Sequence, residues 1–164
     1  MIKILKFMKN KMILILLIAA ACESENMKKE NSSMDYITFG HFYGECGGDK
    51  CVQIYKLTDS SLYEDTEDEY PSFDEPYNGN YVQLQDSLFE KVKKLKNEIP
   101  DKLLTINTKV IGQPDAGDWG GLYFEIAYQG ERRFWLIDKM KSNVPEDLSP
   151  FVDKLNENIK LLND

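Results

Sequence analysis

The sequence is poor in the residues that catalysis and metal binding use most. Its 164 residues include one histidine, His41, and three cysteines. A Ser-His-Asp triad would have to use His41, and no stretch has the form of a nucleophile elbow around a serine. The acidic stretches lack the spacing of a calcium-binding loop. We therefore predict no catalytic residue, no cofactor and no resident metal.

The sequence also lacks an apolar run of about 20 residues, the length needed to cross a bilayer as a helix. Its N-terminal apolar run, Met12–Ala21, has ten residues and follows four lysines within the first eleven positions. A basic start, a short apolar run and small residues at its end are typical of a secretory signal peptide. We assign residues 1–21 to such a peptide.

The residue after Ala19-Ala20-Ala21 is Cys22. This junction resembles the lipobox of bacterial lipoproteins cut by signal peptidase II, with Ala19 where that class usually has leucine. The resemblance covers only the first 22 residues. It implies that Cys22 becomes the mature N-terminus and carries a lipid such as palmitate. It also implies a cell-envelope protein, anchored on the periplasmic or outer side of a bacterial membrane. An ordinary secretion signal, with Cys22 incidental, is the alternative.

Negative charge dominates what remains after the signal peptide. The chain carries 20 basic and 28 acidic residues, and removal of residues 1–21 takes four lysines and no acid, which leaves a net charge of −12. Such a surface repels phosphate backbones and anionic headgroups. We therefore expect no nucleic-acid partner, and membrane contact through the lipid alone. Residues 22–34 are polar and predict a flexible tether, which leaves residues 35–164 as a single domain.

Hydrophobic patterning predicts an α+β domain. Strands are predicted at 36–43, 51–57, 105–112, 122–128 and 131–138, and an acidic surface loop at 58–80. A helix over 87–99 is predicted from the capping-box spacing of Ser87 and Glu90, and a second begins at Ser149-Pro150. These elements fit an antiparallel sheet of about five strands packed against two helices.

Gln129-Gly130 forms a two-residue turn that fixes the register of the last hairpin. Tyr128 then faces Glu131, and the pairing continues so that five apolar side chains lie on one face of the sheet. These are Leu122, Phe124, Ile126, Trp135 and Ile137.

The stretch "YGECGGDKC" places Cys46 and Cys51 around a glycine turn. If the strands pair directly across Gly47–Lys50, the two Cα atoms lie about 4.5–5.5 Å apart, which suits a disulfide. An exported protein meets an oxidising compartment, so we predict a Cys46–Cys51 disulfide. The alternative is a metal or thiol-active centre in which His41 joins the two cysteines.

Two loops carry the residues that suit recognition. The acidic loop interleaves aromatic rings with carboxylates, and "GQPDAGDWGG" places two aspartates beside a tryptophan. The candidate residues are Tyr63, Tyr70, Phe73 and Tyr77 in the first loop, and Asp115, Asp118 and Trp119 in the second.

Taken together, these features favour a lipid-anchored, non-enzymatic binding or adaptor domain. Its expected partners are the membrane, through the lipid, and an envelope protein or cationic ligand. The alternative function is that of a metal-binding or thiol-active envelope protein using His41, Cys46 and Cys51. A small hydrolase with paired carboxylates is a third hypothesis, although the sequence singles out no pair of acids for it.

Overall fold

The computed structural model describes residues 34–48 and 50–163. The predicted signal peptide, Cys22 and most of the predicted tether lie outside the described residues. The described residues form the two hydrophobic cores described below.

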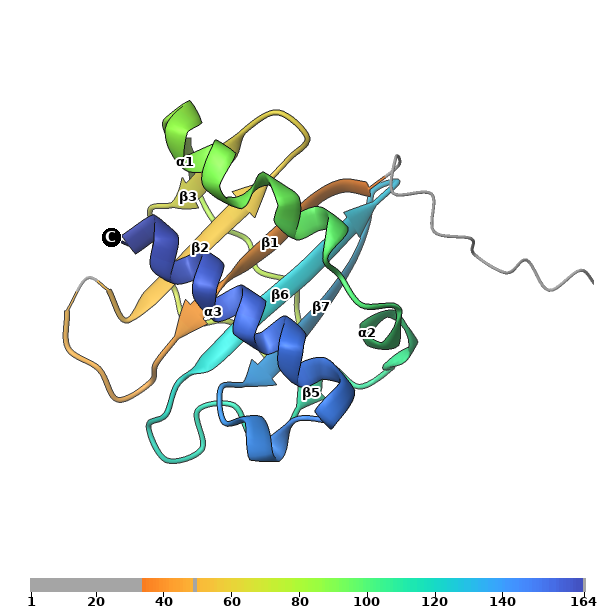
Figure 1. The fold of residues 1–164 in the computed structure, drawn as a ribbon. Coiled ribbons are helices and arrows are strands. Elements are labelled where there is room, and N and C mark those ends of the chain that lie inside the picture. The colour runs from red at the N-terminus through yellow and green to blue at the C-terminus, as the bar shows by residue number, and fades with distance from the viewer. Residues whose placement is uncertain (1–33, 49, 164) are drawn as a thin grey trace, which may run out of the picture.

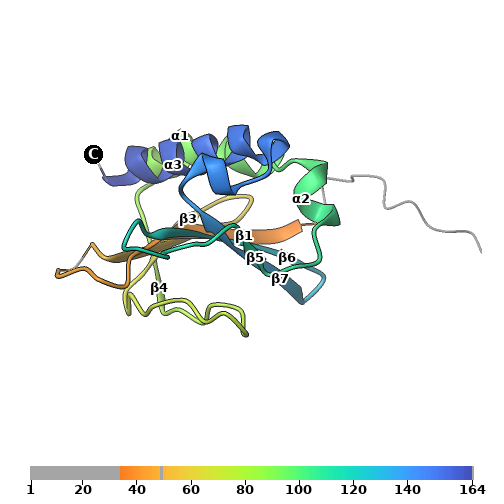
Figure 2. The same cartoon turned by 90° about the horizontal axis from the view of Figure 1, so that it is seen from below.

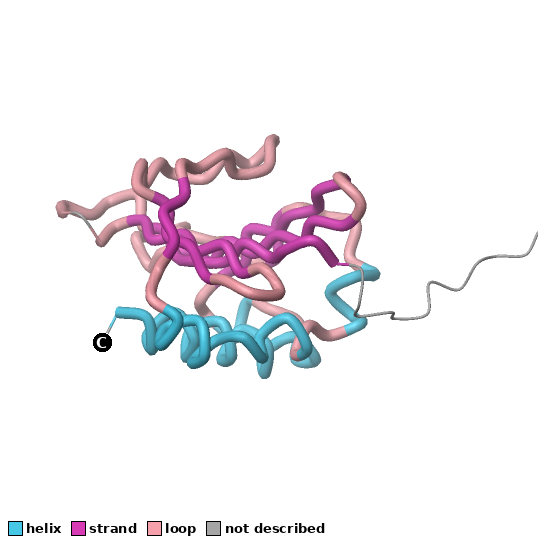
Figure 3. The backbone as a smooth tube through the Cα atoms, turned by 90° about the horizontal axis from the view of Figure 1, so that it is seen from above, coloured by secondary structure: helices cyan, strands magenta, loops and turns pink. Residues whose placement is uncertain are grey.

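One seven-stranded sheet runs through the domain in the order β4-β3-β2-β1-β6-β7-β5. Neighbouring strands are antiparallel except β5 and β7, which are parallel. Helices cover one face of the sheet, and the long β3–β4 loop covers part of the other (Figures 1, 2 and 3). The strands are β1 (Met34–Phe42), β2 (Val52–Leu57), β3 (Leu62–Asp65), β4 (Tyr81–Gln83), β5 (Val110–Ile111), β6 (Gly121–Tyr128) and β7 (Glu131–Asp138).

The helix layer contains three α-helices and three 3₁₀ helices among the described residues. Its members are α1 (Asp86–Val92), η1 (Lys93–Asn97), α2 (Asp101–Thr105), η2 (Lys141–Asn143), η3 (Glu146–Leu148) and α3 (Ser149–Asn163). The α+β class is therefore confirmed, but the sheet is larger than predicted and mixed, and helix α2 was missed.

The last hairpin has the predicted register. Tyr128 pairs with Glu131, and Phe124 pairs with Trp135. Gln129 and Gly130 both have positive φ, of 51° and 83°, as a two-residue hairpin turn of type I′ requires. The five predicted apolar side chains all lie in the core beneath the helices, where Val152, Leu155 and Ile159 of α3 join them.

Other local predictions were wrong. The 58–80 segment contains β3, and the 105–112 segment forms only the two-residue strand β5. Ser87 lies inside α1 and makes no capping hydrogen bond, because the N-cap residue is Gln85. Helix α3 does begin at Ser149, as predicted, and it continues directly from η3.

A second core lies on the sheet face opposite the helices. It is formed by aromatic and aliphatic side chains of β1, β2, β6 and β7, together with Tyr77 from the β3–β4 loop. This core is covered by the β3–β4 loop, Thr66–Asn80, which we call the acidic loop from here on, rather than by a helix. The acidic loop therefore covers the core as well as forming a charged surface.

Candidate functional site

Three loops meet at one end of the sheet, beside the end of β1 and the start of β6. They are Tyr43–Cys51, Thr66–Asn80 and Gly112–Gly120, and the side chain of Asp115 joins them. Its Oδ2 accepts hydrogen bonds from the Gly44 amide at 2.7 Å and the Tyr70 hydroxyl at 2.9 Å. Its Oδ1 accepts one from the Gly120 amide at 3.0 Å. We call the exposed ends of these loops, Gly44–Cys46, Glu67–Tyr70 and Asp115–Trp119, the three-loop surface.

The backbone of Gly112–Gly120 is shaped by residues that tolerate left-handed conformations. Asp115 and Asp118 have φ values of 61° and 64°, and Gly117 has a φ of 107°. Aspartate is among the few residues besides glycine that adopt this region at low cost. Gly44 contributes in another way, since a Cβ there would lie 2.7 Å from Asp115 Oδ2. The absence of a side chain at Gly44 therefore permits the contact.

The predicted disulfide is present, with Cα atoms of Cys46 and Cys51 5.6 Å apart. The predicted register around it was wrong. Phe42 pairs with Val52, and the Tyr43 amide donates to the Cys51 carbonyl at 2.9 Å, so Tyr43 rather than Cys46 lies opposite Cys51. The disulfide therefore closes a small ring within the loop instead of joining two paired strand residues.

His41 lies just before this loop, in β1. Its Nε2 lies 3.1 Å from the Lys50 carbonyl oxygen and donates to it when protonated, and its ring packs on Tyr43. Burial lowers the pKa of His41, and the nearby Lys139 lowers it further, while the Lys50 carbonyl opposes this shift. The alternative His41–Cys46–Cys51 centre is not formed here, because both sulfurs are in the disulfide. No group of three His, Cys, Asp or Glu side chains placed to hold a metal occurs among the described residues.

The predicted recognition residues divide into two sets. Tyr70 is hydrogen-bonded to Asp115, and Asp118 and Trp119 follow Asp115 in the same loop; Trp119 is 59% exposed and Tyr70 43%. Partial burial and the hydrogen bond to Asp115 raise the pKa of Tyr70 to about 12.

The other three predicted residues have different surroundings. Tyr63 is a half-buried residue of β3, and the exposed Phe73 lies further along the acidic loop. Tyr77 is buried at 6% exposure and donates to Asp65 at 2.6 Å. Tyr77 is therefore part of the second core and is not available for recognition.

A buried charged network beneath the acidic loop was not predicted. Glu125 of β6 is fully buried, and Arg132 of β7 donates to its Oε1 at 2.7 Å and its Oε2 at 2.9 Å. The Tyr123 hydroxyl also donates to Glu125 and accepts from the Tyr77 amide at 2.8 Å. Arg132 further binds the Asn78 side chain at 2.8 Å and the Tyr77 carbonyl. The network therefore fastens the end of the loop to the sheet.

Asp65, at the end of β3, holds both ends of the same loop. Its carboxylate accepts from the Asp68 amide at 2.9 Å and the Asn80 amide at 2.6 Å. The acidic loop is thus fixed at both ends by buried carboxylates and at Tyr70 by Asp115. One signal in the sequence pointed to this network, because the register of the last hairpin puts Glu125 and Arg132 on the same face, on diagonally adjacent residues.

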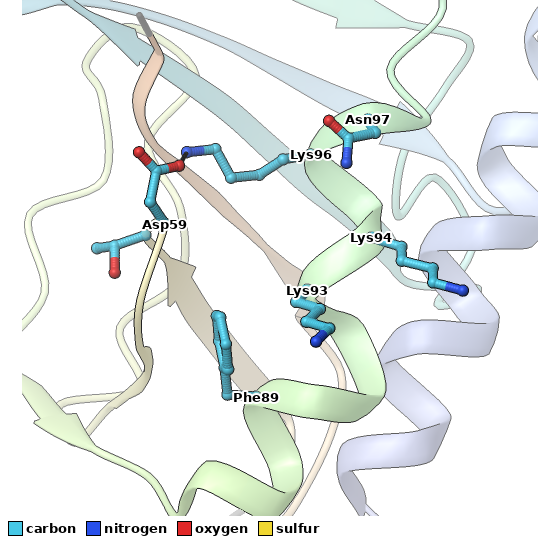
Figure 4. Close-up of a pocket in the computed structure, with 7 residues that line it drawn as sticks. Asp59, Phe89, Lys93, Lys94, Lys96 and Asn97 are labelled. Atoms are coloured by element: carbon cyan, nitrogen blue, oxygen red, sulfur yellow. Dashed lines mark hydrogen bonds and ion pairs between the residues drawn. The ribbon is translucent and has the colours of Figure 1, made fainter. Parts of the chain in front are cut away.

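Two hollows lie elsewhere on the described surface. One, of about 270 Å³, lies between the β2–β3 turn and α1–η1, beside Phe89. Lys96 reaches toward Asp59 there, whereas Lys93 and Lys94 extend in other directions, so the lysines do not converge on one ligand position (Figure 4). The other, of about 330 Å³, lies between the acidic loop and β7. Its cations Lys109, Arg132 and Arg133 already donate to backbone carbonyls.

Comparison of the chain with protein-family models, with curated proteins and with solved structures finds no match. No helix among the described residues is long and apolar enough to cross a membrane.

Proposed function

We propose that this protein is a lipid-anchored binding domain of the bacterial cell envelope that recognises a cationic segment of another envelope protein through its three-loop surface. The anchor rests on the resemblance of the Cys22 junction to a lipobox. The recognition surface rests on one observation, the contact of Asp115 with all three loops. A surface whose loops are already fastened loses little conformational freedom on binding.

The chemistry of the three-loop surface suits a partner rich in lysine or arginine. Glu45, Glu67, Glu69 and Asp118 are exposed carboxylates on it. The exposed rings of Trp119 and Tyr70 offer faces on which a guanidinium or ammonium group can stack. Attraction between the carboxylates and the partner's positive charges speeds association, and stacking of its cationic groups on the two rings slows dissociation.

The recognition surface is tested by photo-crosslinking in the native bacterium, with the whole chain carrying a photoreactive residue at position 119. We expect a discrete adduct with one envelope protein. The matched control carries the same residue at position 161, because Leu161 is also exposed, at 43%, but lies on α3. Adduct yield from position 119 should fall at least fivefold with Asp118→Asn, which removes charge but tolerates positive φ. Equal adducts from positions 119 and 161, or none from 119, would contradict the proposal.

The anchor is tested separately by intact mass and palmitate labelling of the whole chain. We expect a mature protein that begins at Cys22, carries lipid and stays with the membrane fraction. Cys22→Ser should abolish labelling and release the protein from membranes. A mature N-terminus at any other residue would overturn the anchor and leave the crosslinking result to stand alone.

A further inference from the structure

Charge is segregated across the sheet. Residues Asp86–Asn97, which form α1 and η1 on the helix side, contain four lysines and two acids. Residues Thr66–Asn80, which cover the opposite face, contain five acids and no basic residue. Figures 2 and 3 show these two segments on opposite sides of the sheet. Within a negatively charged protein, the segment Asp86–Asn97 is therefore locally basic.

Three of these lysines are exposed and form what we call the lysine ridge, Lys91, Lys93 and Lys94. Lys93 pairs with Glu90 at 2.6 Å, and Lys91 donates to the Leu161 carbonyl at 3.0 Å. Lys94 has no ion pair with any carboxylate within residues 34–48 and 50–163. The ridge thus keeps positive charge that internal partners do not neutralise.

The 3₁₀ helix η1, which holds two of the ridge lysines, reaches the residue at which the described chain begins. Lys96, the next lysine along η1, donates to the Met34 carbonyl at 3.0 Å. From Met34, β1 runs nine residues to Phe42, so its two ends are about 26 Å apart at about 3.3 Å per residue. The three-loop surface lies beyond the Phe42 end (Figure 1). The Lys96 end of η1 and the three-loop surface therefore lie at opposite ends of β1.

We infer that anionic phospholipid headgroups hold the lysine ridge against the membrane that bears the lipid anchor, so that the three-loop surface points away from it. This inference rests on the anchor proposed above. The eleven residues from Glu23 to Ser33 can extend at most about 38 Å, so an anchored domain stays within that distance of the bilayer. At this distance, a few lysines are enough to bias the orientation of the domain, because the lipid anchor already holds these lysines close to the bilayer surface. Repulsion of the acidic loop acts in the same direction.

The orientation is tested with the lipidated whole chain, purified from membranes and reconstituted into vesicles. A fluorescent amino acid is placed at exposed Asn97 or at Trp119, and energy transfer to a headgroup acceptor is measured. In vesicles with 30% phosphatidylglycerol, we expect transfer from position 97 to exceed that from position 119 at least threefold. The ratio should approach one in phosphatidylcholine vesicles and with Lys93→Gln/Lys94→Gln. The control Lys50→Gln/Lys141→Gln, with the same charge change at exposed sites elsewhere, should keep the ratio.

A ratio near one in anionic vesicles would overturn the inference, as would a ratio that ridge neutralisation leaves unchanged. Failure of the anchor is recognised separately, by an intact mass without lipid. In that case, the same measurement is made on residues 22–164 coupled at Cys22 to a maleimide phospholipid. Residues 22–164 include all the residues of the two described cores, and because Cys46 and Cys51 are paired, the maleimide couples at Cys22. The orientation is then supported or overturned by the same ratio.

Discussion

The Arg132 guanidinium contacts both carboxylate oxygens of Glu125, at 2.7 and 2.9 Å, across the diagonal of the β6–β7 hairpin. Glu125 is fully buried. The contact neutralises the Glu125 carboxylate, which would otherwise be a buried, unpaired charge between the sheet and the acidic loop. It also carries the guanidinium to the Asn78 side chain and the Tyr77 carbonyl, so one arginine stabilises both the sheet and its cover.

Removal of this arginine should be among the most damaging single changes. We expect Arg132→Ala to lower the free energy of unfolding by about 3–5 kcal/mol, because it leaves a buried carboxylate without a partner. Urea unfolding followed by fluorescence of the buried Trp135 measures this change. Lys141→Ala, which breaks an exposed pair with Asp153, is the control and should change stability by about 0.5 kcal/mol or less. If Arg132→Ala lowers the free energy of unfolding as little as Lys141→Ala does, the buried network does not stabilise the fold.

The Cys46–Cys51 disulfide closes a short ring, so its effect should be modest. In the chain-entropy model, a loop of this length stabilises the fold by about 2 kcal/mol. We expect Cys46→Ser/Cys51→Ser to remain folded with that loss, measured by urea unfolding without reductant. The wild-type protein in reductant should match the double variant. A larger loss in reductant than in the variant would mean that the reduced thiols disturb the loop themselves.

Asp115 should control the order of the three loops more than global stability. With Asp115→Ala, we expect amide exchange at Gly44 and Gly120 to accelerate about tenfold, the effect of losing about 1.4 kcal/mol of hydrogen bonding. Asp115→Asn keeps an acceptor oxygen and should show a smaller acceleration. Asp118→Ala is a matched control, since its φ of 64° imposes the same backbone strain. If Asp118→Ala accelerates Gly44 equally, strain rather than the Asp115 contact orders the loops.

His41 should make stability fall as the pH drops below neutral. Burial lowers its pKa in the folded protein, while the unfolded chain titrates near pKa 6.5. Between these pKa values, the unfolded chain binds more protons, so the free energy of unfolding rises with pH. The contribution is complete above about pH 6.5 and is lost as the pH falls through the folded pKa. Stability should therefore fall more between pH 7.5 and 5 in the wild type than in His41→Gln. A folded-state pKa at or above 6.5 by NMR would contradict this.

Local sequence rules predicted the elements whose structure depends on residues close together in the chain. The β6–β7 hairpin was predicted in full because its two-residue turn and its alternating apolar residues agree. The disulfide followed from compartment and spacing, although the turn length was wrong. The β1–β2 loop is longer than predicted because Gly44 leaves the strand to meet Asp115, a residue 71 positions away.

The remaining errors have the same cause, tertiary contacts that local patterns do not encode. The segment Thr58–Asn80 has the composition of a solvated loop, yet Tyr77 and Asp65 are buried in it because the sheet needs a cover on that face. Six of the seven candidate recognition residues are exposed or half-buried, but which of them lie near Asp115 depends on how the loops pack. Residues 105–112 form only a short strand, since the chain is occupied there by α2 and by carbonyl contacts to Arg133.

The outermost strands of the sheet, β4 and β5, have three and two residues. Beyond β5, the neighbouring part of β7 is flanked by the Ile106 carbonyl, which accepts from Trp135 Nε1 at 3.2 Å. Short borders of this kind offer few unpaired backbone groups to another sheet. Proteins held on a membrane surface reach high local concentrations, at which long open strands pair between molecules and aggregate. If the protein is anchored as proposed above, the shortness of these two strands favours copies that remain separate on the membrane surface.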